Sequence, residues 1–153
     1  MGGAEEAPRP RPLTLTEAAE MIRNAAEIAR DAAGSAVRAL EGLLERLERG
    51  GAGAEELRRL AEEALDHASK CQEYAGGLLD VAEGRAFALF EEGDHRCLLC
   101  GRRGGGVAFM RFKTGVGHGV VVAVLLCASC ARERSEEARA SIRRLMGVGG
   151  DGE

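Results

Sequence analysis

Two pairs of cysteines with the spacing Cys-x-x-Cys are the strongest chemical signal in this sequence. The first pair is Cys97 and Cys100, and the second is Cys127 and Cys130. Two cysteines separated by two residues can turn both sulfur atoms toward one ion, and Zn²⁺ binds four thiolates as a tetrahedron. Gly101 follows the first pair, where a tight turn around a metal favours a positive φ. The four cysteines therefore predict one structural Zn²⁺ site.

The remaining cysteine and the histidines near these cysteines have roles that the sequence leaves open. Cys71 lies on an apolar stripe, one helical turn after His67, and a free cysteine usually packs there as a small apolar residue. His95 lies two residues before Cys97, so it is a candidate metal ligand or hydrogen-bond donor to a sulfur atom. A closed four-thiolate site leaves no position for a reactive water. Since no catalytic constellation accompanies it, we expect that the protein is not an enzyme.

Two strands and one helix are predicted around the cysteines. Residues 107–113 and 120–126 are rich in β-branched and aromatic side chains, with a glycine-rich turn between them. Residues 131–146 are predicted as a helix that ends at Gly147. A module of about 50 residues builds little apolar core, so the metal would supply part of its folding free energy.

The order of a cysteine knuckle, a β-hairpin and a helix resembles the treble-clef zinc finger. Within that group, residues 95–146 resemble the zinc-binding domain at the N-terminus of the ClpX unfoldase, through CLLCGRR (97–103), LCASC (126–130) and the acidic start of the helix at Glu136 and Glu137. The resemblance implies a domain that dimerises and contacts substrates and adaptors, and it implies four zinc ligands: Cys97, Cys100, Cys127 and Cys130. No phosphate-binding loop occurs in the sequence, so unfoldase activity is not implied.

Two alanine-rich helices are predicted before this module. The first begins near Thr14, whose spacing to Glu17 is that of a capping box, and residues 50–53 (GGAG) end it. The second begins near Ala54 and runs toward Phe90. Apolar residues recur every seven positions in the first helix, in the rows Leu15, Ile22, Ala29, Ala36, Leu43 and Ala19, Ala26, Ala33, Leu40, Leu47.

The second helix has a similar stripe, interrupted at Gly76 and Gly77, where we expect a kink or a close helix crossing. The stripe contains Leu57, Ala61, Ala64, Ala68, Cys71, Ala75, Leu78 and Ala82. Together the stripes predict an antiparallel helical hairpin that resembles a coiled coil. Because alanine buries little surface, we expect the hairpin to self-associate or to bind a protein partner.

These elements predict an α+β fold that is mostly α-helical, with four segments. Residues 1–12 are predicted as a disordered tail whose alternating proline and arginine cannot join a sheet. Residues 13–93 form the acidic hairpin, residues 94–146 the basic zinc module, and residues 147–153 a second disordered tail.

The net charge of −4 hides a strong asymmetry, since residues 13–94 carry −9 and residues 95–146 carry +7. Three interpretations of the basic module stay open. It pairs with the acidic hairpin, within or between chains; it binds a nucleic acid with a salt-dependent affinity; or it is a solvated face with no partner. The sequence does not decide between a protein partner and nucleic acid. The candidate contacts are Arg102, Arg103, Arg111, Lys113, Arg139 and Arg143.

Composition excludes several classes of protein. Aromatic residues make up only 3% of the 153 residues and Trp is absent, which argues against a base-stacking surface. No apolar run approaches the roughly 20 residues that a membrane span needs. The first residues lack the apolar run of a secretory signal, and paired thiols suit a reducing compartment, so we expect a cytoplasmic protein.

Overall fold

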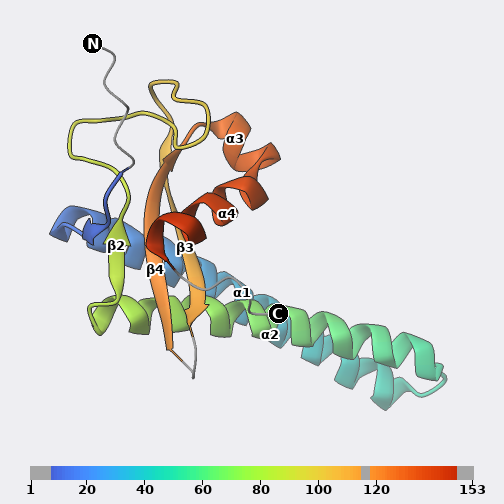
Figure 1. The fold of residues 1–153 in the computed structure, drawn as a ribbon. Helices are drawn as coiled ribbons and strands as arrows, with labels where there is room; N and C mark the ends of the chain where they lie inside the picture. Colours follow the sequence, from blue (N-terminus) through green and yellow to red (C-terminus); the bar gives the residue numbers. More distant parts are fainter. Residues whose placement is uncertain (1–7, 115–117, 148–153) are drawn as a thin grey trace, which may run out of the picture. The chain divides into compact units, whose positions relative to one another are not determined.

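The computed structural model describes residues 8–114 and 118–147 (Figure 1). The chain divides into two compact units, which we call the helical unit (Glu20–Leu79) and the sheet unit (the described residues before Glu20 and after Leu79). In chain order the elements are β1 (Arg11–Pro12), α1 (Leu15–Arg49), α2 (Ala54–Ala82), β2 (Ala86–Ala88), β3 (Gly106–Thr114), β4 (His118–Leu126), α3 (Ala128–Glu133) and α4 (Ser135–Met146).

The start of α1 confirms the predicted capping box. The Thr14 N–H donates to Oε1 of Glu17 at 2.8 Å, and the Glu17 N–H donates to Oγ1 of Thr14 at 3.2 Å. The Glu17 carboxylate also accepts two hydrogen bonds of 3.0 Å from Arg11, whose guanidinium lies 5.3 Å from the centre of the Phe90 ring. Arg11 therefore joins the segment before α1 to the residues that follow β2.

The prediction that residues 1–12 cannot join a sheet is wrong at Arg11 and Pro12, while residues 1–7 lie outside the described part of the chain. These two residues form β1, which pairs antiparallel with β2, and Pro12 lies opposite Phe87. β1 is the edge strand of the sheet, and an edge position tolerates proline because one side of the strand needs no ladder hydrogen bond.

The second helix ends earlier than predicted. α2 stops at Ala82 and does not continue toward Phe90; it runs through Gly76 and Gly77 without ending. Gly84 adopts a φ of +80°, and the Arg85 N–H donates to the Asp80 carbonyl oxygen at 2.8 Å, which closes the helix. Residues 86–88 then form β2, parallel to β4, so part of the predicted hairpin domain belongs to the sheet.

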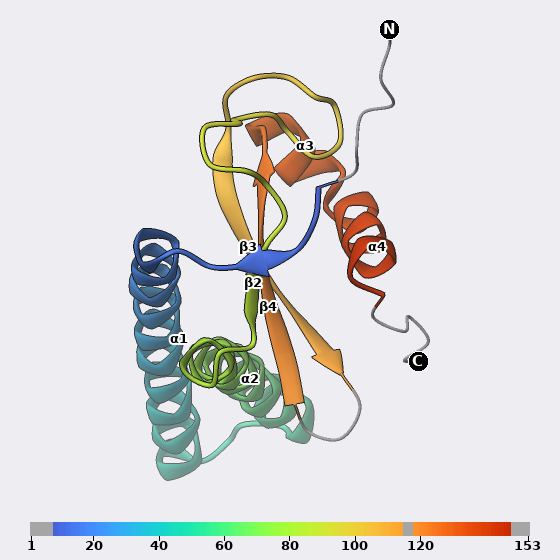
Figure 2. The same ribbon diagram turned by 60° about the vertical axis from the view of Figure 1, so that its left-hand side comes forward.

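The sheet has the strand order β1-β2-β4-β3, and its β3–β4 pair confirms the two predicted strands. The turn predicted between them spans residues 114–119; of these, Thr114 belongs to β3 and His118 and Gly119 to β4, and residues 115–117 lie outside the described residues. β4 is an inner strand whose residues from Val121 to Leu126 are all buried, which explains its uninterrupted apolar run. Helix α4 packs on one face of the sheet (Figure 2). The core between them includes Met110, Phe112, Val122, Val124, Leu126, Ala138 and Ile142.

The predicted helix at residues 131–146 is two helices. α3 begins at Ala128. Non-helical backbone angles at Arg134, a φ of −128° and a ψ of 29°, end α3 before α4 begins. Gly147 ends α4 with a φ of +66°, as the sequence predicts.

The helical unit is a hairpin of two long packed helices, α1 and α2. Arg46 and Glu56 form an ion pair of 2.9 Å on either side of the connecting loop. Within the described residues, no helix is long and apolar enough to cross a lipid bilayer.

The heptad period of the hairpin was predicted correctly, but the two rows predicted for α1 do not form the seam. Of the stripe predicted for α2, Leu57, Ala64, Cys71 and Leu78 are buried or half-buried. Of the two rows predicted for α1, only Ala36 is buried, while Ile22, Leu40 and Leu47 are exposed. One set of buried and half-buried positions follows steps of three and four along another face: Met21, Ala25, Ile28, Ala32, Ser35, Ala39, Gly42 and Arg46 in α1, and Leu57, Leu60, Ala64, His67, Cys71, Tyr74 and Leu78 in α2. This is the spacing of a helix face packed on another helix.

A buried ion pair lies in the sheet unit. Asp80 is only 3% exposed, and its Oδ2 accepts a hydrogen bond of 2.7 Å from Nε of Arg111. Gly119 makes room for this pair, because a Cβ atom there would lie 2.6 Å from Oδ2 of Asp80. Arg111 therefore compensates a buried carboxylate.

We expect Arg111→Ala to lower the free energy of unfolding by about 2–4 kcal/mol, because it leaves the Asp80 carboxylate buried without its counter-charge. Lys113→Ala is the matched control: Lys113 lies two residues along the same strand and is exposed. Its removal should change the free energy by less than about 0.5 kcal/mol. Urea unfolding of the zinc-loaded protein measures both, and equal effects would contradict this role of Arg111.

Candidate metal centre

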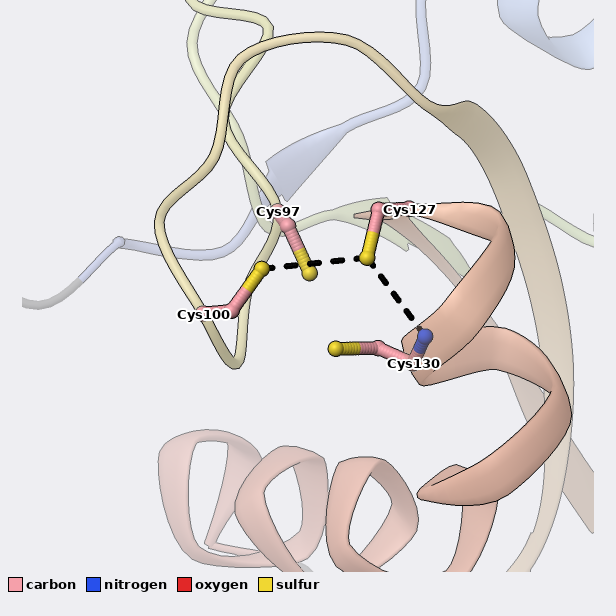
Figure 3. A group of neighbouring side chains, drawn as sticks. All are labelled: Cys97, Cys100, Cys127 and Cys130. Carbon is pink, nitrogen blue, oxygen red and sulfur yellow. Dashed lines mark hydrogen bonds between the residues drawn. The ribbon is translucent and has the colours of Figure 1, made fainter.

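The four predicted cysteines converge on one point of the sheet unit (Figure 3). The Sγ atoms of Cys97, Cys100, Cys127 and Cys130 all lie within 4.8 Å of one another, and those of Cys100 and Cys127 are 3.7 Å apart. Four thiolates bound to Zn²⁺ at about 2.3 Å in a tetrahedron lie about 3.8 Å from each other. The donor set and its spacing therefore fit a four-coordinate metal ion.

Backbone hydrogen bonds shape the first pair into a tight knuckle. The Gly101 N–H donates to the Cys97 carbonyl oxygen at 3.0 Å, and the Cys97 N–H donates to the Arg102 carbonyl oxygen at 2.8 Å. Gly101 has a φ of +73°, as predicted for a turn that folds back on itself. The Leu98 N–H donates to the Leu125 carbonyl oxygen at 2.8 Å, which fixes the knuckle to the end of β4.

The second pair lies where β4 passes into α3. Cys127 occupies the N-cap position, and its sulfur accepts a hydrogen bond of 3.4 Å from the Cys130 N–H. The first turn of α3 therefore places the Cys130 sulfur beside that of Cys127. Arg134, four residues after Cys130, donates to the Cys130 sulfur at 3.9 Å and binds Glu137 at 2.6 Å. Arg134 was not predicted as a site residue, because the helix was predicted to begin only after Cys130, which hid the i+4 spacing between the two residues.

Gly105 lets the loop after the knuckle pass against the backbone of the second pair. A Cβ atom at Gly105 would lie 2.5 Å from the Leu126 carbonyl oxygen and 2.9 Å from Cα of Cys127. Neither contact can be relieved by a side-chain rotation, because both are with backbone atoms. The packing of the two cysteine segments thus requires glycine at this position.

We expect Gly105→Ala to weaken Zn²⁺ affinity at least about tenfold more than Gly104→Ala, because only the former clashes with the second cysteine segment. The control is matched, since Gly104 also has a positive φ, +95° against +109° at Gly105, but a Cβ atom there would meet nothing within 4 Å. Competition with a chromogenic chelator gives both affinities. Equal losses of Zn²⁺ affinity in the two variants would show that the positive φ, and not the close backbone contact, is the reason for glycine at position 105.

The thiols differ in acidity. Burial disfavours the thiolate of Cys97, but hydrogen bonds with the backbone of Cys100, Cys127 and Leu99 outweigh it and lower the pKa of Cys97 to about 6. The backbone N–H of Cys130 lowers the pKa of Cys127. Hydrogen bonding with the Cys127 side chain raises the pKa of Cys130 to about 12. Near neutral pH, the Cys97 thiol is therefore ionised while the Cys130 thiol keeps its proton. A bound cation favours the thiolate form of all four cysteines.

Zn²⁺ binding should release fewer than four protons at about pH 7.5, because a thiol of pKa about 6 at Cys97 is already mostly ionised whereas Cys130 still holds its proton. The number released should rise as the pH falls toward 6, where Cys97 also becomes protonated. Calorimetric titrations in buffers of different ionisation enthalpy count these protons. Release of four at the higher pH would contradict the lowered pKa of Cys97.

His95 and Cys71 do not join the metal-binding group. The backbone carbonyl of His95 accepts a hydrogen bond of 2.8 Å from the Gly104 N–H, so the residue helps to shape the loop. Cys71 lies half-buried in the heptad row of α2, one turn after His67.

The six basic residues predicted as candidate contacts have different surroundings. Arg111 and Lys113 project from the side of β3 opposite to Phe112 by strand alternation, and Arg111 is paired with Asp80. Arg139 and Arg143 of α4 lie 5.4 Å and 5.6 Å from the centre of the Phe112 ring. Arg102 and Arg103 are exposed on the knuckle, away from both groups in sequence.

A comparison with known proteins finds no match among protein families, curated proteins or solved structures. The resemblance to the ClpX zinc-binding domain therefore stays a prediction from the residues.

Proposed function

We propose that the protein is a non-enzymatic interaction module in which a structural Zn²⁺ stabilises the sheet unit. The observation that carries this proposal is the convergence of four thiols from two segments within 4.8 Å. Cys97, Cys100, Cys127 and Cys130 would hold the ion, and a metal with four protein ligands has no position for substrate or reactive water. Such an ion supplies folding free energy.

The order of the elements supports a treble-clef arrangement for this centre. A knuckle carries the first two cysteines, β3 and β4 follow as a hairpin, and α3 begins at the second pair. The sheet is larger than a minimal zinc finger, because β1 and β2 extend it beyond the hairpin. A role as an adaptor similar to that of the ClpX zinc-binding domain belongs to this proposal.

Exposed apolar side chains support a protein as the partner. Most of the large hydrophobic residues that are exposed in the described chain belong to the helical unit. Solvent-exposed leucines on one helix are typical of an interaction surface. Nucleic acid is the alternative partner, but three of the six candidate basic residues already contact other groups: Arg111 the Asp80 carboxylate, and Arg139 and Arg143 the Phe112 ring.

The zinc proposal is tested by metal content and amide protection of the full chain. We expect one Zn²⁺ per chain in the wild type and in Cys71→Ser, and loss of the metal in Cys97→Ser and Cys130→Ser. A strong chelator should abolish amide protection in β3 and β4, because the metal joins the segments on either side of this hairpin. Unchanged protection after chelation, or equal metal loss in Cys71→Ser, would overturn a structural zinc site.

A further inference from the structure

Helix α1 carries a second apolar row on another face. Val37, Leu40, Leu44 and Leu47 are each between 52% and 56% exposed. Their steps of three, four and three residues are those of a and d positions in a coiled coil. At about 100° per residue, this row lies roughly 130° around the helix axis from the buried heptad row of the hairpin. A helix with apolar rows on two faces can pack against one helix on each face.

The hairpin accounts for only one of these helices. Apart from Met21, the fully buried apolar side chains of the helical unit are alanines: Ala25, Ala32, Ala36 and Ala64. Three of the leucines of α1, Leu40, Leu44 and Leu47, instead lie in the exposed row. The helical unit therefore exposes large apolar side chains whose burial against another helix would stabilise it.

We infer that a second copy of this chain covers the row, with the two α1 helices parallel and the same residues facing each other. This inference rests on the proposed function as an interaction module and names its partner. The row consists of one valine and three leucines, so an identical helix supplies matching side chains at every layer. A two-fold axis along the helices would place Leu40 against Leu40 of the partner subunit.

The residues beside the row favour the parallel orientation. Glu41 and Glu48 occupy the e positions, and Ala36 and Leu43 the g positions. In a parallel pair each e residue lies beside a g residue of the other helix, so each glutamate meets an apolar side chain. In an antiparallel pair e positions face each other, and the glutamates would repel. Arg30, at the preceding a position, limits the paired region to the residues after it.

Sedimentation of the zinc-loaded full chain tests the pairing. We expect the wild type to sediment as a dimer, at twice the chain mass of 16.1 kDa. Leu40→Ala with Leu44→Ala should raise the dissociation constant at least about 100-fold, since both remove central apolar contacts and alanine preserves the helix. Leu65→Ala is the matched control, because Leu65 is also an exposed helical leucine, at 64%, but lies on α2.

A wild-type monomer at about 100 µM, or a dimer that the double substitution leaves intact, would overturn the inference. Zinc content measured on the same samples separates this failure from failure of the metal site, because the row lies outside the cysteine group.

The orientation is tested by a cysteine cross-link in the Cys71→Ser background with Zn²⁺ bound. Leu40→Cys alone should form a disulfide-linked dimer under mild oxidation, since parallel helices bring position 40 of each chain together. Arg38→Cys, on another face of α1, should not. Cross-linking only when Leu40→Cys is mixed with Leu44→Cys would show antiparallel helices and contradict the proposed pairing.

Discussion

The sheet unit depends on the approach of two cysteine segments that are 27 residues apart between Cys100 and Cys127. The chain between them forms the β3–β4 hairpin, whose length and register decide whether the segments meet. Nine residue pairs run from Gly106 opposite Leu126 to Thr114 opposite His118. The hairpin thus brings Leu126, and with it the second cysteine pair, back beside Gly106, which follows the knuckle. A slip of register would displace the second cysteine pair and turn the strand faces over.

The metal centre and the apolar core form one structure. Cys97 and Cys130 belong to the same buried cluster as Phe112, Val124 and Ile142, so each cysteine pair contributes one sulfur to the core. Cys100 is exposed and Cys127 half-buried, on the outer side of the group. An ion bound there would close one end of a core that contains few large side chains. Helix α4 closes the adjacent face of the sheet through Ala138 and Ile142.

Local chemistry was readable from the sequence wherever a few adjacent residues decide the structure. The capping box at Thr14 and Glu17, the positive φ of Gly101 and the left-handed Gly147 all depend on neighbours within one turn. β2 was missed because its alanines continue the spacing of the preceding helix, while its partner strand lies more than 30 residues further along the chain. No local sequence pattern predicts the pairing of residues 86–88 with β4, and this pairing outweighs the helical propensity of their alanines.

The same distinction explains the error in the hairpin rows. A period of seven residues follows from helix geometry, but alanine occurs on several faces of α1, so apolarity alone does not single out the seam. The structure places small residues such as Ala25 and Ala32 in the seam, and the larger Leu40 and Leu44 outside it. Small side chains let two helices approach closely but stabilise each other little. The alanines of the seam therefore contribute little burial, and the exposed leucines of the outer row are the side chains that association would bury.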